Sequence, residues 1–349
     1  MKLAFYLPCY WPDMSYPADR MYDDMVRQAV LAEGIGMGSV WIPEHHFVNL
    51  LVHPSPLLTA VHVAAATKRI RIGTAILVLP LYDVRRLAGE IAQADQLTRG
   101  RLEIGVGRGA FAYELDHFGV PIEETRSRFD ESLEILERLL TECNVSVDTP
   151  RYKFGPVTIT PSCYQRPMPP VWMAAVQPEA IYHCAKRGYN VTTTALRSPF
   201  EEARQQALAF RRGCDERVAG TRPRLSVLRM GFPCRDRADV AAKLALAAHN
   251  DQHHNAMRSP GSEVIEGGIV PRETGRTLKD LEDALLIGTA DEVLEKLCRY
   301  AEIGVDEFVI NMGFGPSHRD VMEGLELLGT RIMPQLPASV EVRQHAEAV

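Results

Sequence analysis

A carboxylate and two adjacent imidazoles, Glu44, His45 and His46, follow the short apolar run at residues 39–42. Histidine is the side chain whose ordinary pKa lies nearest neutral pH, so it can give and take protons during catalysis. Successive side chains of a strand point to opposite faces, so only one of the two histidines can face a given pocket. The segment is therefore either a site for acid–base chemistry or a structural pair of histidines.

A glycine-rich stretch at residues 105–110 reads Gly-Val-Gly-Arg-Gly-Ala and matches the dinucleotide-binding fingerprint GxGxxA. That fingerprint needs a helix directly after it and an acid at the end of the next strand. Residues 111–125 look irregular instead, which argues against a dinucleotide site. The glycines could allow close approach of a flat ligand, and Arg108 could bind a phosphate. The alternative is an exposed arginine in a glycine turn.

Two further segments have residue types that could form a site. Gly73, Thr74 and Ala75 are small and end an apolar run, so they either leave room for a planar ring or are ordinary core. His249 and His253 have the i, i+4 spacing of a metal pair. No partner beyond Asp251 is evident, so we expect a solvated loop and no metal site. The sequence contains neither a GxSxG nucleophile elbow nor a P-loop.

The elements that position these residues follow a regular rhythm. Eight apolar runs alternate with amphipathic segments, at residues 3–9, 39–43, 70–77, 101–107, 171–175, 190–195, 225–232 and 307–312. Eight βα units without a break in composition predict one (β/α)₈ TIM barrel over residues 1–349. We expect a hairpin at 145–160 and a long polar insertion at 250–280, between strand seven and strand eight. Polar residues at strand ends then include Glu44, Thr74, Arg108, Gln177 and Arg197, on the face where such barrels carry their sites.

Bulk composition excludes several classes of function. The chain has 39 basic and 45 acidic residues and a formal net charge of −6, so no basic excess exists to meet nucleic acid or anionic lipid. Its seven cysteines are scattered without any CxxC, which favours reduced thiols in a cytoplasm. The apolar N-terminal run is too short for a signal peptide, and no run approaches a membrane span. We therefore expect a cytoplasmic protein.

Taken together, the chain resembles the bacterial luciferase-like, flavin-dependent monooxygenases, and most closely the luciferase α-type subunit and its monooxygenase relatives. The likeness rests on five segments in family order: EHHF at 44–47, GTA at 73–75, DQLTRGRL at 95–102 leading into GVGRG at 105–109, GTADEV at 288–293, and MPQL at 333–336. These segments span nearly the whole chain, and they are specific jointly rather than singly.

The resemblance implies a TIM barrel, usually dimeric, that binds FMN at its C-terminal face. His45 matches the active-site histidine, Arg108 matches the arginine that holds the FMN phosphate, and Ala75–Ile76 falls where the family has a non-prolyl cis peptide beneath the flavin ring. Residues 250–280 match the mobile loop that shields reduced flavin. The remaining expected cofactor-binding residues are Glu44, Thr74, Gly107, Gly109, Val176 and Gln177.

Two departures from the family pattern bear on the substrate and the flavin. Hydroxyl residues that often bind the phosphate after strand five are replaced here by Ala-Val-Gln-Pro-Glu-Ala at 175–180, which suggests weaker binding of a diffusing flavin. Gly107 stands where the luciferase α-type chain has a reactive cysteine. The glycine is expected to open space beside the ring, which argues against a long-chain aldehyde substrate.

The resemblance implies a two-component monooxygenase. An NAD(P)H:flavin reductase supplies FMNH₂, O₂ forms a flavin C4a-hydroperoxide, and one oxygen atom passes to a small organic substrate. His45 would be the general acid/base, and Glu44 would support it through His46. A homodimer is expected. Two alternatives remain open: a hydride-transfer oxidoreductase using F420 or tightly bound FMN, and a non-catalytic partner subunit like the luciferase β-type chain. Such subunits tend to lack the active histidine and the long loop, which this chain retains.

Overall fold

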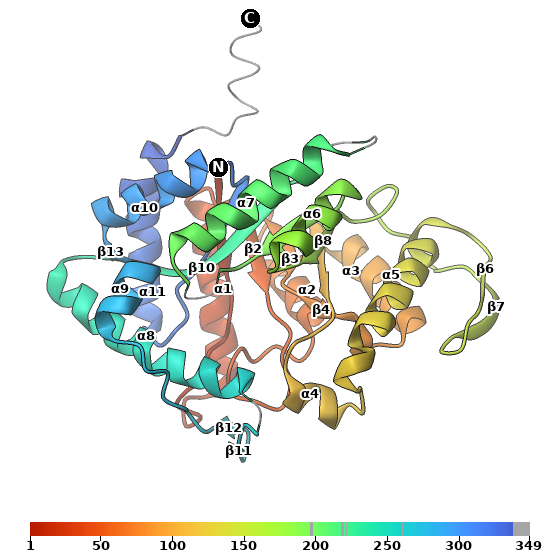
Figure 1. The fold of residues 1–349 in the computed structure, drawn as a ribbon, viewed down its shortest axis with the longest axis horizontal. Helices are drawn as coiled ribbons and strands as arrows, with labels where there is room; N and C mark the ends of the chain where they lie inside the picture. The colour runs from red at the N-terminus through yellow and green to blue at the C-terminus, as the bar shows by residue number, and fades with distance from the viewer. Residues whose placement is uncertain (196–197, 218–219, 221, 260, 338–349) are drawn as a thin grey trace, which may run out of the picture.

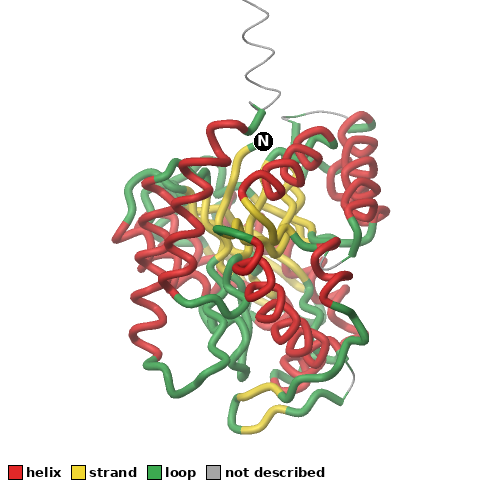
Figure 2. The backbone as a smooth tube through the Cα atoms, turned by 90° about the vertical axis from the view of Figure 1, so that its left-hand side faces the viewer, coloured by secondary structure: helices red, strands yellow, loops and turns green. Residues whose placement is uncertain are grey.

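The computed structural model describes residues 1–195, 198–217, 220, 222–259 and 261–337, and Arg197 lies outside them. Eight parallel strands close into a barrel, because the last neighbour in the sheet order, β9, also pairs with β10. The barrel strands are β1 (Lys2–Tyr6), β2 (Ser39–Ile42), β3 (Arg71–Thr74), β5 (Leu102–Gly107), β8 (Val171–Ala174), β9 (Asn190–Thr193), β10 (Leu225–Cys234) and β14 (Glu307–Asn311). The predicted (β/α)₈ barrel is confirmed, and Figure 2 shows its strands at the centre of a helical shell.

Helices pack their apolar faces against the outside of the barrel (Figure 1). They are α1 (Ala18–Gly34), α2 (Pro56–Ala66), α3 (Val84–Leu97), α5 (Thr125–Thr141), α6 (Pro178–Lys186), α7 (Phe200–Asp215), α8 (Arg237–Arg258), α10 (Ala290–Glu302) and α11 (His318–Leu327). Several begin at side-chain caps: Asp83 accepts a bond from the backbone of Arg85, and Ser317 forms a capping box with Asp320. No helix in the described part of the chain is long and apolar enough to cross a membrane.

Smaller elements complete the fold. Strands β6 (Val145–Asp148) and β7 (Lys153–Val157) form an antiparallel pair at one side of the molecule. The two-residue strand β4 (Leu77–Val78) pairs with β5, and β13 (Leu286–Thr289) pairs with the distal half of β10. A one-turn helix, η1, covers Leu79–Leu81, and the chain continues after α11 through the π-helical turn η3 (Leu328–Ile332).

The connection between β10 and β14 differs from the predicted polar loop at 250–280. Helix α8 does not stop near His249 but continues to Arg258. The extension is held by tertiary contacts, since the Asn255 side chain donates to the carbonyls of Arg272 and Glu273. A short hairpin, β11 (Val264–Ile265) with β12 (Gly268–Ile269), and helix α9 (Leu278–Ala284) follow. The prediction of a solvated loop at His249–His253 is wrong, because both residues lie on α8.

The β11–β12 hairpin lies at the C-terminal mouth of the barrel. In Figure 1 it occupies the same lower edge of the molecule as helix α4 (Ala112–His117), opposite the N-terminus. Asn49, in the loop after β2, joins it by two hydrogen bonds: its backbone N–H donates to Gly267 O at 2.8 Å, and its Oδ1 accepts from Ile269 N at 3.2 Å. The hairpin therefore covers part of the mouth.

The N-terminal half of the barrel interior, called the lower half from here on although it points upward in Figure 1, is filled. Trp41 and Trp172 meet edge to face with their rings 5.2 Å apart, and a side chain at Gly73 would collide with Trp41. Below them, the Trp41 indole donates to Glu307 at 2.8 Å, and the Trp172 indole donates to Glu103. Such a packed lower half leaves the C-terminal half as the place for a ligand.

The two buried acids in this lower layer differ in their partners. Glu103 forms ion pairs with the guanidinium groups of Arg71 and Arg224, and Arg224 Nη2 lies 3.0 Å from Glu103 Oε2. Glu307 is buried and forms no ion pair with a described residue, so desolvation, with repulsion by Glu103 as the smaller cause, raises its pKa to about 7. Glu307 therefore keeps its proton in the folded protein up to roughly neutral pH.

We predict that Glu307→Gln becomes progressively more stable than the wild type as pH rises. The unfolded chain releases this proton near pH 4.5 and the folded protein near pH 7. The proton-linked stabilisation is thus complete below the lower value and lost as pH rises through the upper one. The gap in unfolding free energy should grow by up to about 3 kcal/mol between pH 4.5 and pH 8. Urea unfolding across this range measures it, with exposed Glu326→Gln as control; a pH-independent gap would contradict the assignment.

Candidate active site

The predicted residues meet at one face because all barrel strands run in the same direction. Ala75, Gly107 and Ala174 stand at or just beyond the C-terminal ends of the neighbouring strands β3, β5 and β8. On β8, Ala174 shares the inner face with buried Trp172, since side chains two apart point the same way. Ala174 is nevertheless exposed. The upper barrel is therefore open to solvent and walled on this side by small residues.

His45 is held in a fixed orientation at this mouth. Its Nδ1 lies 2.8 Å from Glu114 Oε1, its ring centroid lies 4.7 Å from that of Phe111, and 13% of its side chain is exposed. With Nδ1 bound to a carboxylate, the other ring nitrogen, Nε2, has no hydrogen-bond partner among the described residues. A histidine oriented in this way can exchange a proton at Nε2.

Glu114 is the residue that sequence reasoning missed. It lies on α4, in a segment expected to be irregular, and its Oε1 also accepts a bond from the backbone N–H of His46 at 2.8 Å. One carboxylate thus fixes both the His45 ring and the loop that carries it. The only hint in the sequence is an aromatic residue and an acid, Phe111 and Glu114, directly after the glycine-rich stretch.

Glu44 lies beneath the mouth rather than in it. Its side chain is 0% exposed, and Oε1 lies 3.0 Å from His46 Nε2. Its other oxygen accepts bonds from Val78 N at 3.0 Å and from the Tyr82 hydroxyl at 2.9 Å. Burial, together with this carboxylate, raises the pKa of Tyr82, so its hydroxyl remains a donor. These three contacts give the carboxylate the supporting role that was expected through His46, and a cofactor contact of Glu44 stays a prediction.

The two histidines face different partners, although not for the reason that the sequence suggested. Strand β2 ends at Ile42, so strand alternation does not reach His45 and His46. A third histidine, His53, is fully buried and lies close by, with its backbone carbonyl accepting from His45 N at 3.3 Å. Burial lowers the pKa of His53 to about 4, and its Nε2 lies 2.7 Å from Leu7 O. His53 is therefore a neutral, structural histidine.

Residues at the ends of β3 and β5 shape the floor of the mouth. The Ala75–Ile76 peptide bond is cis, as the resemblance implies. The buried Thr74 hydroxyl donates to Gly105 O at 2.8 Å and accepts from Gly105 N at 2.9 Å, so it is not available to a ligand. The expectation that Gly107 opens space is wrong: a side chain there would collide with Ile76, which already fills that volume.

Arg108, Val176 and Gln177 lie on adjacent strand ends, because Val106 of β5 pairs with Met173 of β8. All three are exposed, and no described residue pairs with the Arg108 guanidinium. Gln177 is the N-cap of α6, where unpaired backbone N–H groups attract anions. Gly109, at φ +77°, adopts the left-handed conformation that glycine favours and turns the chain after Arg108. This corner of the mouth suits a phosphate.

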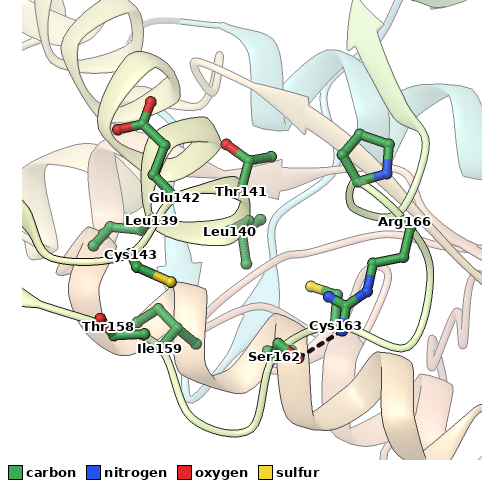
Figure 3. Close-up of a pocket in the computed structure, with 12 residues that line it drawn as sticks. Leu139, Leu140, Thr141, Glu142, Cys143, Thr158, Ile159, Ser162, Cys163 and Arg166 are labelled. Atoms are coloured by element: carbon green, nitrogen blue, oxygen red, sulfur yellow. Dashed lines mark hydrogen bonds between the residues drawn. The ribbon is translucent and has the colours of Figure 1, made fainter.

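Two cavities lie elsewhere on the molecule. One, of about 330 Å³, lies outside the barrel between the end of α5 and residues 158–167 (Figure 3), and none of the predicted site residues lines it. The other, of about 530 Å³, opens between α1 and α11 beside the ends of β1 and β14. Within the described residues, no three His, Cys, Asp or Glu side chains gather in a way that could hold a metal ion.

Comparison with known proteins shows the family of this chain. The model of the luciferase-like monooxygenase family matches residues 1–307, so the chain belongs to that family. The oxygenase component of a flavin-dependent trigonelline monooxygenase from Acinetobacter baylyi is 28% identical over 338 residues, covering 94% of this chain and 93% of the relative. The monooxygenase RslO1 from Streptomyces bottropensis has the same fold, with a TM-score of 0.83, 24% identity, and coverage of 96% and 99% of the two chains.

The fold itself is shared by enzymes with another cofactor. An F420-dependent secondary alcohol dehydrogenase superposes with a TM-score of 0.74 at 16% identity, covering 97% of this chain and 99% of the other. At this identity the likeness shows the fold alone. Family membership therefore establishes a luciferase-like oxidoreductase fold, while the cofactor and the substrate depend on the site.

Glu44→Ala should destabilise the fold rather than only weaken ligand binding. The change leaves His46, Val78 N and the Tyr82 hydroxyl without their buried acceptor, which should lower the free energy of unfolding by roughly 2–4 kcal/mol. Arg108→Ala, at an exposed position without a partner, should change it by less than about 0.5 kcal/mol. Urea unfolding of the two variants compares them. If Glu44→Ala lost flavin binding but kept its free energy of unfolding, Glu44 would be a cofactor contact and not a structural support.

Proposed function

We propose that this protein is the oxygenase component of a two-component, FMNH₂-dependent monooxygenase that inserts one oxygen atom from O₂ into a small organic substrate. The observation that carries the proposal is His45, fixed through Nδ1 by Glu114, with Nε2 free at an open barrel mouth. The trigonelline monooxygenase relative is itself named an oxygenase component, which supports a reductase partner.

The residues of the mouth fit a flavin. Ala75, Ile76 and Ala174 offer an apolar wall on one side, against which a planar ring system can lie. At the same edge, Arg108 and the N-terminus of α6 offer a cation and backbone donors for the phosphate of FMN. Arg108, Gly109, Val176 and Gln177 would hold the phosphate end, and Ala75–Ile76 would lie beneath the ring. Reduced flavin would supply the electrons that activate O₂.

His45 would move a proton at Nε2 during oxygen transfer, while Glu114 keeps the ring in place through Nδ1. Phe111 limits ring rotation by packing against it at 4.7 Å. The β11–β12 hairpin, bonded through Gly267 and Ile269 to Asn49, would exclude water from reduced flavin when closed, and the segment around it would open for exchange.

The partners follow from the same proposal. A cytoplasmic NAD(P)H:flavin reductase would deliver FMNH₂, because the glycine-rich stretch at 105–110, which matches a dinucleotide fingerprint, is assigned here to the flavin. A homodimer is supported by α2, whose sequence PLLTAVHVAAA is apolar nearly all round although Leu58 is 73% exposed. A helix apolar on every face is normally buried, and a second copy would cover it.

Hydride transfer with F420 remains the rival function because the fold serves both chemistries. A non-catalytic subunit is disfavoured by the His45–Glu114 pair, since a subunit without chemistry has no need for an oriented histidine at an open mouth. Dependence on O₂ separates oxygenation from hydride transfer, because only an oxygenase stops without it.

The function is tested with purified protein, pre-reduced FMN, ¹⁸O₂ and a panel of small ring compounds that includes trigonelline. We expect one ¹⁸O atom in the product, no turnover without O₂, and none with reduced F420. His45→Ala should keep its FMNH₂ affinity but lose product by at least about 100-fold, with O₂ released as peroxide. His183→Ala, at a histidine whose side chain is 64% exposed in the last turn of α6, is the control. Turnover without O₂, or unchanged yield in His45→Ala, would overturn the proposal.

Arg108→Ala should weaken binding of FMN and FMNH₂ by about 10- to 100-fold, since a charge-assisted hydrogen bond contributes roughly 1.5–3 kcal/mol. Riboflavin, which lacks the phosphate, should bind the variant and the wild type alike. Arg126→Ala on α5 removes an exposed arginine from elsewhere and serves as the matched control. Equal FMN dissociation constants for Arg108→Ala and the wild type would exclude Arg108 from the phosphate site.

A further inference from the structure

Opposite the wall of small residues, the mouth carries two polar side chains that the proposed chemistry does not use. They are Tyr6 at the end of β1 and Asn311 at the end of β14. The two strands are neighbours, and the register pairs Phe5 with Ile310, so Tyr6 and Asn311 follow at the same height. Adjacent strands lie about 4.8 Å apart, which brings the two side chains together on one face of the sheet.

That face is the inside of the barrel. Along β1, Ala4 and Tyr6 both belong to the apolar cluster that contains Trp41 and Trp172. Along β14, Glu307 receives the inward Trp41 indole and Val309 joins the same cluster, so Asn311 continues this inner row. Ala75 and Phe111 pack against the same cluster as Tyr6, and Phe111 in turn packs against the His45 ring.

Tyr6 carries a hydroxyl without a protein partner. Only 5% of the residue is exposed, yet no described residue hydrogen-bonds its oxygen. The fully enclosed unpaired atoms of the described chain belong to Thr193, Gln206, Ser226 and Arg229, so the Tyr6 oxygen borders accessible space. Buried tyrosine hydroxyls ordinarily find a partner, and this one faces the mouth. Burial raises the pKa of Tyr6, so the group is a hydrogen-bond donor at neutral pH.

Asn311 supplies a second donor. Its side-chain oxygen accepts from Gly313 N at 3.0 Å, which assigns the oxygen and leaves the NH₂ group as the free end. No described residue accepts from that NH₂, and Asn311 is only partly buried. Two donors therefore stand side by side, with no Lys or Arg on the inner faces of β14, β1 or β2 at this height.

We infer that Tyr6 and Asn311 form a donor pair that binds a carbonyl oxygen of the substrate, and that the substrate is a small, uncharged ring compound carrying a ketone, lactam or similar carbonyl group. Two donors match the two lone pairs of one carbonyl oxygen, and the absence of a cation at this height disfavours a carboxylate. The apolar surroundings of Tyr6 accept the ring. The inference rests on the proposed function, in which this side of the mouth faces the substrate and the Ala75–Ala174 side faces the flavin.

The test uses two probes of equal shape, acetophenone and α-methylstyrene, which differ by a C=O in place of a C=CH₂. Binding to the intact protein without flavin is measured by calorimetry. We expect Tyr6→Phe to weaken the binding of acetophenone about fivefold, since one neutral hydrogen bond is lost, and to leave the binding of α-methylstyrene unchanged. Asn311→Asp keeps an oxygen that accepts from Gly313 N but puts a second carboxylate oxygen in place of the NH₂ donor. It should weaken the binding of acetophenone about tenfold or more.

Thermal unfolding of the variants shows whether a loss of probe binding comes from a loss of folding. Tyr6→Phe should unfold at the wild-type temperature, because the hydroxyl bonds no protein group. Failure of acetophenone to bind the wild type, equal losses for both probes, or loss of FMN affinity in Tyr6→Phe would each overturn the inference. The two-probe calorimetry contains neither flavin nor O₂, and FMN affinity is titrated separately, so the outcome is independent of the oxygenation test. Oxygenation of a substrate together with failure of the two-probe test would reject only the carbonyl site.

Discussion

The asymmetric filling of the barrel is the constraint on which the rest of this structure depends. Trp41 and Trp172 meet at 5.2 Å in the middle of the interior, and the acids Glu103 and Glu307 with their indole and guanidinium donors close the lower end. A barrel of eight strands has only enough interior for side chains. A ligand can therefore enter only where the inner residues are small, which is above the tryptophans.

The upper half divides into two sides because of the strand order. Strands β3, β5 and β8 contribute Ala75, Gly107 and Ala174, while β14 and β1 contribute Asn311 and Tyr6. His45 stands after β2, between the two sides, so one imidazole nitrogen can serve a flavin on one side and a substrate on the other. Its position depends on Glu114, which reaches across from α4 and binds both the ring and the loop backbone. Orientation by a carboxylate lets an otherwise mobile histidine act at one atom.

Sequence reasoning found the barrel because buried parallel strands read as short continuous apolar runs, and eight such runs stand out. It also placed His45 and Arg108 at the C-terminal face, beyond the ends of β2 and β5, and their roles there stay predictions. It missed Glu114 because α4 spans only Ala112–His117, too short for helical periodicity, and because the contact joins residues far apart in the chain.

Other errors have similar physical causes. The end of α8 is stabilised by tertiary contacts such as those of Asn255, which helix signals in the sequence do not record. The support of His46 by Glu44 was anticipated from the sequence and is present at 3.0 Å, but the further partners of Glu44 were not anticipated. Its burial depends on the Val78 backbone and the Tyr82 hydroxyl, which come from the next βα unit. Open space beside Gly107 was expected because glycine has no side chain, but the Ile76 side chain occupies that space.

The most direct test of the account is a crystal structure of the protein with FMN bound. The account predicts the isoalloxazine ring against Ala75, Ile76 and Ala174, the phosphate at Arg108 and the N-terminus of α6, and open space between the ring and the Tyr6–Asn311 pair. FMN bound in the cavity between α1 and α11, or a ring placed directly on Tyr6 and Asn311, would contradict it.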